Sequence, residues 1–230
     1  MHREPLILAM LVLTTAAAPA PAPAASPWLA ATAGHADYAM DEFLGPTYEY
    51  RNRYPRAFAP GTLDGGFSFT AAAGADLGRH WSLAVEYERV DASTFSLAGS
   101  PYVEADLPVH LFKLEPAWYP LAGTRARAGL GAGAGVAFLS GFLHSDYGDP
   151  YNGDISATTW AADARLIGEF SPVRALWLTA AAGWRALTFD EVIFGHTLMA
   201  DPDSGELKPL TYGGWYLRAG LRWELPGGDR

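Results

Sequence analysis

The stretch Pro108–Phe142, PVHLFKLEPAWYPLAGTRARAGLGAGAGVAFLSGF, alternates in steps of two over most of its length. In its second half, one set of alternate positions is charged or glycine and the other set is apolar. The first set is Arg125, Arg127, Gly129, Gly131, Gly133 and Gly135, and the second is Ala126, Ala128, Leu130, Ala132, Ala134, Val136 and Phe138. A period of two indicates a β-strand, because successive side chains point to opposite faces. The stretch therefore predicts two long strands joined by a Pro/Gly turn at residues 119–124.

Long strands with one polar, charged face and one apolar face are typical of a transmembrane β-barrel, which has lipid outside and a polar interior. The same alternation recurs at residues 66–77, 81–88, 158–170, 176–185 and 212–225. Residues 28–38, with Trp at the start and Gly and Ala through the middle, have the weakest strand pattern and are interpreted as the remaining strand. The predicted fold class is therefore all-β, an eight-stranded antiparallel up-and-down transmembrane β-barrel. Its connections alternate between long loops, at 40–64, 91–106, 144–157 and 189–210, and short turns. This alternation is the topology of outer-membrane barrels, whose short turns are periplasmic.

Composition narrows the class of protein. The chain has 230 residues, half of them hydrophobic, no Cys and a formal net charge of −9. The length suits one β domain, and the absence of Cys excludes disulfides, thiolate metal sites and an acyl-cysteine anchor. The acidic balance argues against a nucleic-acid partner. Outside the N-terminus, no apolar run reaches the roughly 18 residues of a membrane-spanning helix.

Residues 1–24 are predicted to be a secretory signal peptide. His2 and Arg3 precede an apolar stretch at 5–18, and Ala22-Pro-Ala24 fits the small-x-small cleavage pattern. A retained membrane anchor is the less favoured alternative, because the stretch is short and rich in Ala and Pro. The mature chain is then a single outer-membrane β-barrel domain at residues 25–230.

Tryptophans mark both ends of the predicted strands. One group lies at the turn ends and comprises Trp81, Trp118 and Trp223. The other lies toward the loop ends and comprises Trp160, Trp184 and Trp215. Two such groups are expected as aromatic girdles at the two membrane interfaces. The alternation assigns Trp177 to the inward face, so this tryptophan fits neither girdle.

Alternation alone fits a soluble barrel of the lipocalin type equally well, with the apolar face inside. Three features favour the membrane barrel: the aromatic girdles, the Gly/Arg/Glu composition of the polar face and the C-terminal sequence Arg218-Ala-Gly220-Leu-Arg-Trp223-Glu-Leu225. Retention of the protein in outer membranes after carbonate washing would separate the two classes.

The chain resembles the small eight-stranded outer-membrane barrels of the OmpA/OmpX/OmpW type and, more broadly, the porin-like outer-membrane β-barrel domain family. The resemblance lies in the strand ending at Trp118-Tyr119-Pro120, the glycine ladder Gly129–Gly135 and the C-terminal segment. That segment, with Arg218, Gly220, Trp223 and Leu225, is similar to the barrel-assembly signal, although the chain continues for five residues beyond it. The resemblance implies recognition by the barrel-assembly machinery and a place in a Gram-negative outer membrane.

The polar face is predicted to form a charge network inside the barrel. Its members are Asp76, Glu86, Glu88, Glu115, Asp163 and Glu169, with Lys113, Arg125, Arg127, Arg165, Arg185, Arg218 and Arg222. An eight-stranded barrel is only wide enough to be filled by side chains, and unpaired charges there are costly. The favoured interpretation is a paired network that fills the interior. The alternative is a narrow, charge-lined path for small solutes.

The spacing of His, Ser and acidic residues in the sequence does not bring a set of catalytic side chains together. His144-Ser145-Asp146 are adjacent, and neighbours on a strand face opposite sides. His110 lies near the outer rim, within reach of Ser100 or Asp106, and the His-x-Ser strand motif of outer-membrane lipid A deacylases is absent. The chain is therefore predicted not to be an enzyme; a lipid-modifying outer-membrane enzyme is the less favoured alternative.

The loops contain acid-rich turns at 146–154 and 201–206, whose oxygen atoms suit calcium. Neither matches a full calcium loop, and Asx, Pro and Gly residues of this kind usually form turns, so no metal or cofactor is predicted. The Tyr/Arg-rich stretch 48–56 suits lipopolysaccharide phosphates or a partner, because Arg side chains suit phosphate. The favoured interpretation of this stretch is an ordinary solvated loop.

The predicted function is non-enzymatic: a monomeric structural or surface-interaction barrel with a side-chain-filled polar interior, in contact with the lipid bilayer and lipopolysaccharide. The alternative is a narrow passive channel for small solutes.

Overall fold

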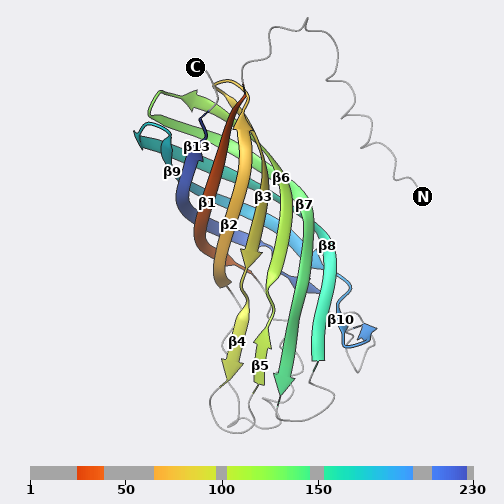
Figure 1. Cartoon of the computed structure of the whole chain (residues 1–230). Coiled ribbons are helices and arrows are strands. Elements are labelled where there is room, and N and C mark those ends of the chain that lie inside the picture. The colour runs from red at the N-terminus through yellow and green to blue at the C-terminus, as the bar shows by residue number, and fades with distance from the viewer. Residues whose placement is uncertain (1–24, 39–64, 97–102, 146–152, 199–208, 227–230) are drawn as a thin grey trace, which may run out of the picture.

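The computed structural model describes residues 25–38, 65–96, 103–145, 153–198 and 209–226. Eight long strands form a closed ring, in which each strand pairs antiparallel with its neighbours and the last pairs with the first (Figure 1). They are β1 (Ser26–Asp37), β2 (Gly65–Asp76), β3 (Trp81–Val90), β6 (Val109–Ala122), β7 (Ala126–Ser145), β8 (Gly153–Val173), β9 (Leu176–Phe189) and β13 (Gly214–Glu224). Within the described ranges, no helix is long and apolar enough to cross a membrane. The predicted signal peptide and the 40–64 loop lie outside the described residues.

The ring closes with a stagger between strands. Following paired residues once around the barrel leads from Ser26 back to β1 at Ala36, ten residues farther along the same strand. The path runs through Asp76, Ser82, Ala117, Gly131, Arg165, Gly183 and Tyr216. A stagger of this kind requires tilted strands, typically by about 35–45° from the barrel axis. Side chains from all eight strands therefore meet in a common interior, which we call the lumen.

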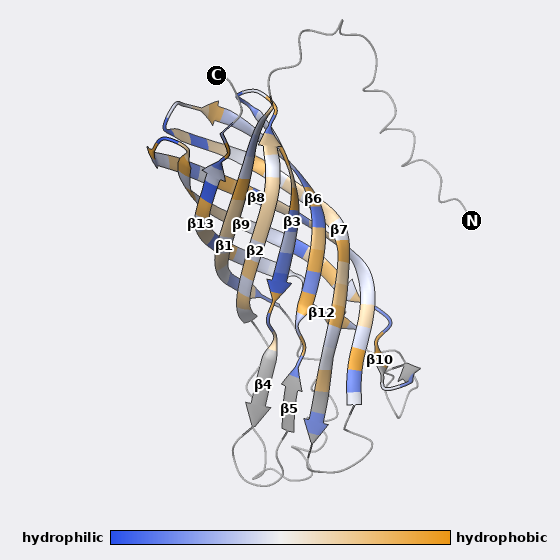
Figure 2. Ribbon diagram, in the orientation of Figure 1, coloured by the Kyte–Doolittle hydropathy of each residue, from blue (hydrophilic) through white to orange (hydrophobic). Residues whose placement is uncertain are grey.

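The outer surface of the ring is apolar. Apolar and polar residues alternate along the strands in Figure 2, and the apolar set faces outward: Val85 is 59% exposed and Leu217 is 64% exposed. All six tryptophans of the predicted girdles lie on this surface, and the rings of Trp81 and Trp118 pack 6.4 Å apart at the turn end. An apolar outer face with aromatic residues at both ends is the surface of a barrel that lies in lipid.

Part of the sequence interpreted as loops forms strands. Residues 91–106 contain β4 (Ser93–Ser96) and β5 (Val103–Asp106), a hairpin that pairs with β7. The predicted loop at 144–157 is wrong at both ends, because β7 continues to Ser145 and β8 begins at Gly153. The predicted loop at 189–210 holds short strands: β10 (Ile193–Phe194), β11 (Thr197–Leu198) and, reaching Thr211, β12 (Leu210–Thr211). Pairing with a neighbouring strand outweighs the local turn signals in these segments.

These additional strands build a sheet that projects beyond the ring, in the order β4, β5, β7, β8, β10 and β11 (Figure 1). The strands β7 and β8 have 20 and 21 residues, whereas a tilted strand needs only about 9–11 to cross a bilayer. The excess length of both strands lies at the loop end. We call this extension the projecting sheet.

Two glycines of the ladder on β7 are required by close backbone contact. A Cβ atom at Gly135 would lie 1.8 Å from the carbonyl oxygen of Phe112, and one at Gly129 would lie 2.4 Å from that of Trp118. Both oxygens belong to the paired strand β6, which cannot move without breaking its own hydrogen bonds. At these positions the glycines therefore allow β6 and β7 to pair.

We expect Gly135→Ala to lower the free energy of unfolding by about 1–3 kcal/mol, the usual cost of overpacking. The measurement is urea unfolding in phospholipid vesicles, followed by tryptophan fluorescence and heat-modifiable gel migration. Gly168→Ala on β8 is the matched control, because its Cβ would meet nothing within 4 Å. Equal stability of the two variants would contradict the close-contact explanation.

Candidate functional site

The turn-side part of the lumen holds a group of four charged side chains, which we call the turn-side cluster: Asp76, Arg127, Glu169 and Arg222. The Arg127 guanidinium donates to Asp76 Oδ2 at 3.1 Å and also to Glu169. Arg222 Nη2 donates to the same Asp76 oxygen at 2.5 Å, and its Nη1 lies 3.3 Å from Glu169 Oε2. The two carboxylates and the two guanidinium groups therefore neutralise each other's charge inside the lumen.

Aromatic rings cover the arginines of this cluster. The Arg127 guanidinium lies 4.1 Å from the ring centre of Tyr119 and 5.1 Å from that of Trp177. The Arg222 guanidinium lies 4.3 Å from the ring centre of Trp28. Trp177, the tryptophan that fits neither girdle, is buried and donates from Nε1 to Glu224 Oε1 at 2.8 Å. Cation–π contact with desolvated arginines is favourable, and these rings narrow the turn end of the lumen.

Lys113 is the centre of a second group farther toward the loops. Its ammonium nitrogen lies 3.1 Å from Glu86 Oε1, 3.0 Å from Glu88 Oε2, 3.2 Å from Glu115 Oε1 and 2.5 Å from Asp163 Oδ2. The Lys113 side chain is 0% exposed. A single cation thus contacts four carboxylates that come from three different strands.

Three arginines balance the remaining negative charge. Arg185 Nη1 donates to Glu88 Oε1 at 2.8 Å, Arg218 Nη1 to Glu86 Oε1 at 2.7 Å and Arg165 Nη1 to Glu86 Oε2 at 3.1 Å. We call these three arginines, with Lys113 and its four carboxylates, the central cluster. It contains four acids and four bases, so it is neutral as a unit. The arrangement follows the rule that buried charges are paired and hydrogen-bonded.

Arg125 lies outside these clusters, and its predicted place in the lumen is wrong. Its side chain is exposed in the turn before β7 begins at Ala126. The register between β6 and β7 shifts between Trp118 and Leu121, so the alternation cannot be extended through this turn. The other eleven predicted members of the lumen network lie in the lumen, together with Asp76. Without Arg125, the described part of the lumen contains six acidic and six basic side chains. Its net charge is therefore zero, whereas the sequence predicts a slightly positive lumen.

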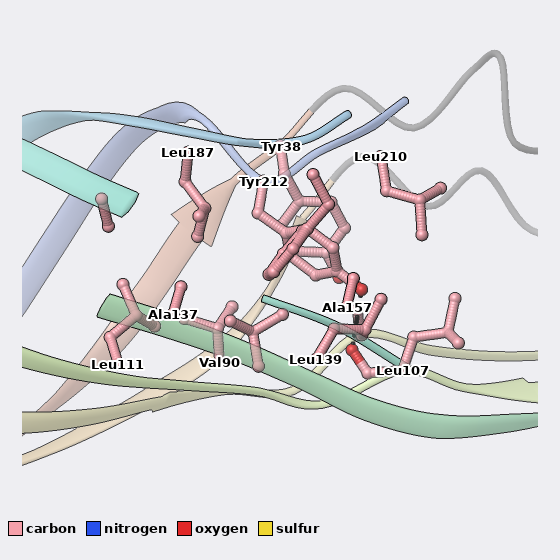
Figure 3. Close-up of a cluster of buried hydrophobic side chains, with 14 of the residues drawn as sticks. Tyr38, Val90, Leu107, Leu111, Ala137, Leu139, Ala157, Leu187, Leu210 and Tyr212 are labelled. Carbon is pink, nitrogen blue, oxygen red and sulfur yellow. Dashed lines mark hydrogen bonds between the residues drawn. The ribbon is translucent and has the colours of Figure 1, made fainter. Parts of the chain in front are cut away.

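The loop-side third of the lumen is apolar, which the sequence interpretation missed. Tyr212 is central to it: its ring lies 5.5 Å from Tyr38 and 5.8 Å from Phe189, and its hydroxyl donates to the Leu107 carbonyl at 2.8 Å. Figure 3 shows side chains of this cluster, among them Tyr38, Leu107 and Tyr212, between the strands. We call this group the apolar plug; it includes Tyr38, Val90, Leu107, Val109, Leu111, Leu139, Ile155, Leu187, Phe189, Val192, Leu210 and Tyr212.

The plug and the central cluster are joined. Arg185 donates from Nε and Nη2 to the Tyr212 carbonyl at 3.2 and 3.1 Å, while its Nη1 holds Glu88. Tyr216, on the border between the two, donates to Asp163 Oδ1 at 3.3 Å. Hydrogen bonds therefore connect the polar and the apolar layers at this border.

A cavity of about 60 Å³ lies between the two charged clusters. Side chains that line it include Trp28, Thr32, Thr70, Glu115, Arg165 and Arg222. This volume accommodates a few water molecules and is far below the roughly 300–1,000 Å³ of small-molecule sites. The inward-facing charged side chains and those of the apolar plug are buried or nearly buried, and the space between the two clusters is small.

Comparison with known proteins gives matches to solved structures only. No protein-family profile and no curated protein matches the sequence. Neisserial surface protein A is similar over 86% of this chain and 97% of its own, with a TM-score of 0.52 at 16% identity. The chain has the fold of the small outer-membrane β-barrels. This result confirms the fold class predicted from the sequence.

Two further outer-membrane barrels match over most of their length. The Yersinia pestis attachment invasion protein Ail, solved with the heparin analogue sucrose octasulfate, covers 86% of this chain and 99% of its own, at 13% identity and a TM-score of 0.49. The Pseudomonas aeruginosa outer-membrane protein OprG covers 90% and 99%, at 12% identity and a TM-score of 0.48.

The residues of the proposed assembly signal are distributed over both faces of the barrel. Arg218 points into the central cluster, Trp223 faces outward, and Leu225 follows β13. A Cβ atom at Gly220 would lie 2.1 Å from the carbonyl oxygen of Ala31. The glycine thus permits β13 to pair with β1, the contact that closes the barrel.

The other candidate residues from the sequence do not form a site in the described part of this barrel. His110 faces outward and hydrogen-bonds to the Tyr87 hydroxyl at 2.8 Å, and His144 is exposed on β7. Ser100, Asp146 and most of both acidic turns lie outside the described residues. Among the residues with described positions, no group of three or more His, Asp or Glu side chains is placed to hold a metal ion.

Proposed function

We propose that this protein is a non-enzymatic barrel of a Gram-negative outer membrane that keeps its lumen closed and displays a rigid sheet at the cell surface. The observation that carries the proposal is the apolar plug above two neutral ion clusters, which leaves a cavity of about 60 Å³. A solute path would need continuous space along the axis, so the closed lumen favours display over transport.

The cost of opening supports a permanently closed lumen. An ion that enters from the loop side has to displace apolar side chains such as Leu111 and Phe189, which are 0% exposed. It then meets Lys113, whose displacement from its four carboxylates would leave the central cluster with three bases for four acids, and so with an uncompensated buried charge. Breaking a buried ion pair typically costs about 3–5 kcal/mol. The plug and the clusters are therefore suited to stabilise the barrel.

The projecting sheet is the surface that such a barrel would display. It continues β7 and β8 past the girdle residue Trp160 without interruption, so it is held by the ring itself. Strand β4 pairs on one side with β5 and is an edge strand of the described sheet. The edge strand of a sheet offers unpaired backbone donors and acceptors to an extended partner segment. A protein partner that adds a strand is the interaction this geometry suits best.

Membrane location and orientation can be tested with single cysteines, since the natural chain has none. Ser156→Cys lies on the exposed face of β8 in the projecting sheet, and Thr124→Cys lies in an exposed turn at the opposite end. We expect a membrane-impermeant maleimide to label Ser156→Cys on intact cells. Thr124→Cys should react only after the outer membrane has been permeabilised.

Labelling of both variants on intact cells, or of neither, would contradict the proposed orientation. Heat-modifiable gel migration of each variant shows that the barrel has folded. Loss of the protein from the membrane fraction after carbonate washing would favour a soluble barrel instead.

A further inference from the structure

The turn end of the barrel has a basic rim, although the chain as a whole has a net charge of −9. Each of the three short turns has one exposed arginine: Arg79 between β2 and β3, Arg125 between β6 and β7, and Arg174 between β8 and β9. The segments 77–80, 123–125 and 174–175 contain no Asp or Glu. Glu224, the acid at the end of β13, accepts a hydrogen bond from Trp177. The turn end therefore presents positive charge in three places around the ring.

The arginines lie next to the edge of the outer apolar surface. An exposed apolar residue precedes each of them by a few positions: Leu77 (45% exposed), Leu121 (69%) and Val173 (58%). Trp81, Trp118 and Trp223 of the turn-side girdle lie at the same end. A long cationic side chain beside apolar surface places its head group at the lipid–water boundary while its stem stays in the apolar region. In all three turns the exposed arginine follows an exposed apolar residue by one to four positions, so the sequence and exposure suit this arrangement.

The described residues at the opposite end of the barrel are mainly acidic. They include the exposed acids Asp37, Asp154, Asp190 and Glu191, and the exposed Arg89 is paired with Asp91. Residues 91–106 contain three acids and no Lys or Arg. The three turns therefore differ in charge from the described residues at the loop end, and they favour an anionic surface on the turn side.

We propose that Arg79, Arg125 and Arg174 form a binding rim for the phosphate head groups of anionic phospholipids in the turn-side leaflet. The inference rests on the proposed membrane location of the barrel. A guanidinium suits phosphate because it donates several hydrogen bonds in a fixed plane. Three such contacts around the ring hold the turn end at the head-group level, while the girdle tryptophans occupy the apolar side of the boundary.

The test uses tryptophan quenching by brominated lipids in vesicles that contain equal amounts of phosphatidylglycerol and phosphatidylcholine. A turn-side reporter keeps Trp81, Trp118 and Trp223, with Phe at 160, 184 and 215. A loop-side reporter has the reverse set, and both keep the lumen residues Trp28 and Trp177. For the turn-side reporter, we expect brominated phosphatidylglycerol to have a relative association constant about two- to five-fold above that of brominated phosphatidylcholine.

Replacing all three rim arginines with Gln should bring this ratio to about one, and so should about 1 M salt, where the Debye length is about 3 Å. The loop-side reporter should give a ratio of about one with or without the arginines. A ratio of one in the unmodified rim, or a ratio that survives the triple substitution, would overturn the inference. Absence of quenching by either lipid would instead mean that the barrel does not insert, which is a failure of the proposed membrane location.

Discussion

Replacing Lys113 with Met should lower the free energy of unfolding by about 3–5 kcal/mol, because it leaves a buried ion cluster with an uncompensated charge. Lys113 contacts four carboxylates and is 0% exposed. Met has a similar length and shape, so the change removes the charge with little loss of packing. Urea titration of the refolded barrel in phospholipid vesicles, followed by tryptophan fluorescence, measures the difference.

A second substitution keeps the Lys113 prediction testable if the single variant fails to fold. Glu88→Gln in the same chain restores neutrality of the central cluster and should recover a measurable part of the lost stability. Arg89→Met is the matched control, because Arg89 pairs with Asp91 at 2.7 Å but both side chains are exposed. Exposed pairs contribute about 0–1 kcal/mol. A Lys113 variant as stable as the Arg89 variant would show that the central cluster is hydrated rather than buried.

The second large effect is expected in the apolar plug. Phe189→Ala should lower the free energy of unfolding by about 3–5 kcal/mol, the usual cost of emptying a packed aromatic position. Phe189 is 0% exposed and packs edge-on against Tyr212. The same urea titration provides the measurement, and Phe189→Leu should recover most of the loss because it refills the space with apolar atoms.

Phe170→Ala on β8 is the control for the plug. Phe170 is 50% exposed on the outer surface, where lipid chains can fill the vacated space, so only the transfer contribution is lost and no cavity is left. We expect the Phe170 variant to be less destabilised than the Phe189 variant. Equal losses would mean that the loop-side lumen is loosely packed.

Much of the architecture can be predicted from the sequence, because alternation of period two assigns each strand residue to a face. It identifies eight strands, their antiparallel order and the inward set around Lys113, and the closed ring confirms the fold class. Contacts within the lumen depend on strand register, which alternation does not contain. Arg222 and Asp76 are separated by 146 positions in the sequence and meet only because β13 pairs with β1 and β1 with β2.

The errors have two physical origins. Residues 146–152 are rich in Asp, Gly and Pro, and this turn signal masks the ends of β7 and β8, where strand pairing decides the structure. The inner face is polar in the middle of the strands but apolar at the loop end. Leu111, Leu139 and Ile155 are on the inward alternation and carry the signal for the apolar plug.

The central claim is that side chains close the lumen, and planar-bilayer recording tests it most directly. The chain from residue 25 to residue 230 is refolded, checked by heat-modifiable gel migration and inserted into a bilayer for single-channel recording. The plug and the two neutral clusters predict no conductance steps from the folded protein. Reproducible steps of constant size, absent from bilayers without protein, would contradict the closed lumen and make Lys113 and its partners the lining of a pore.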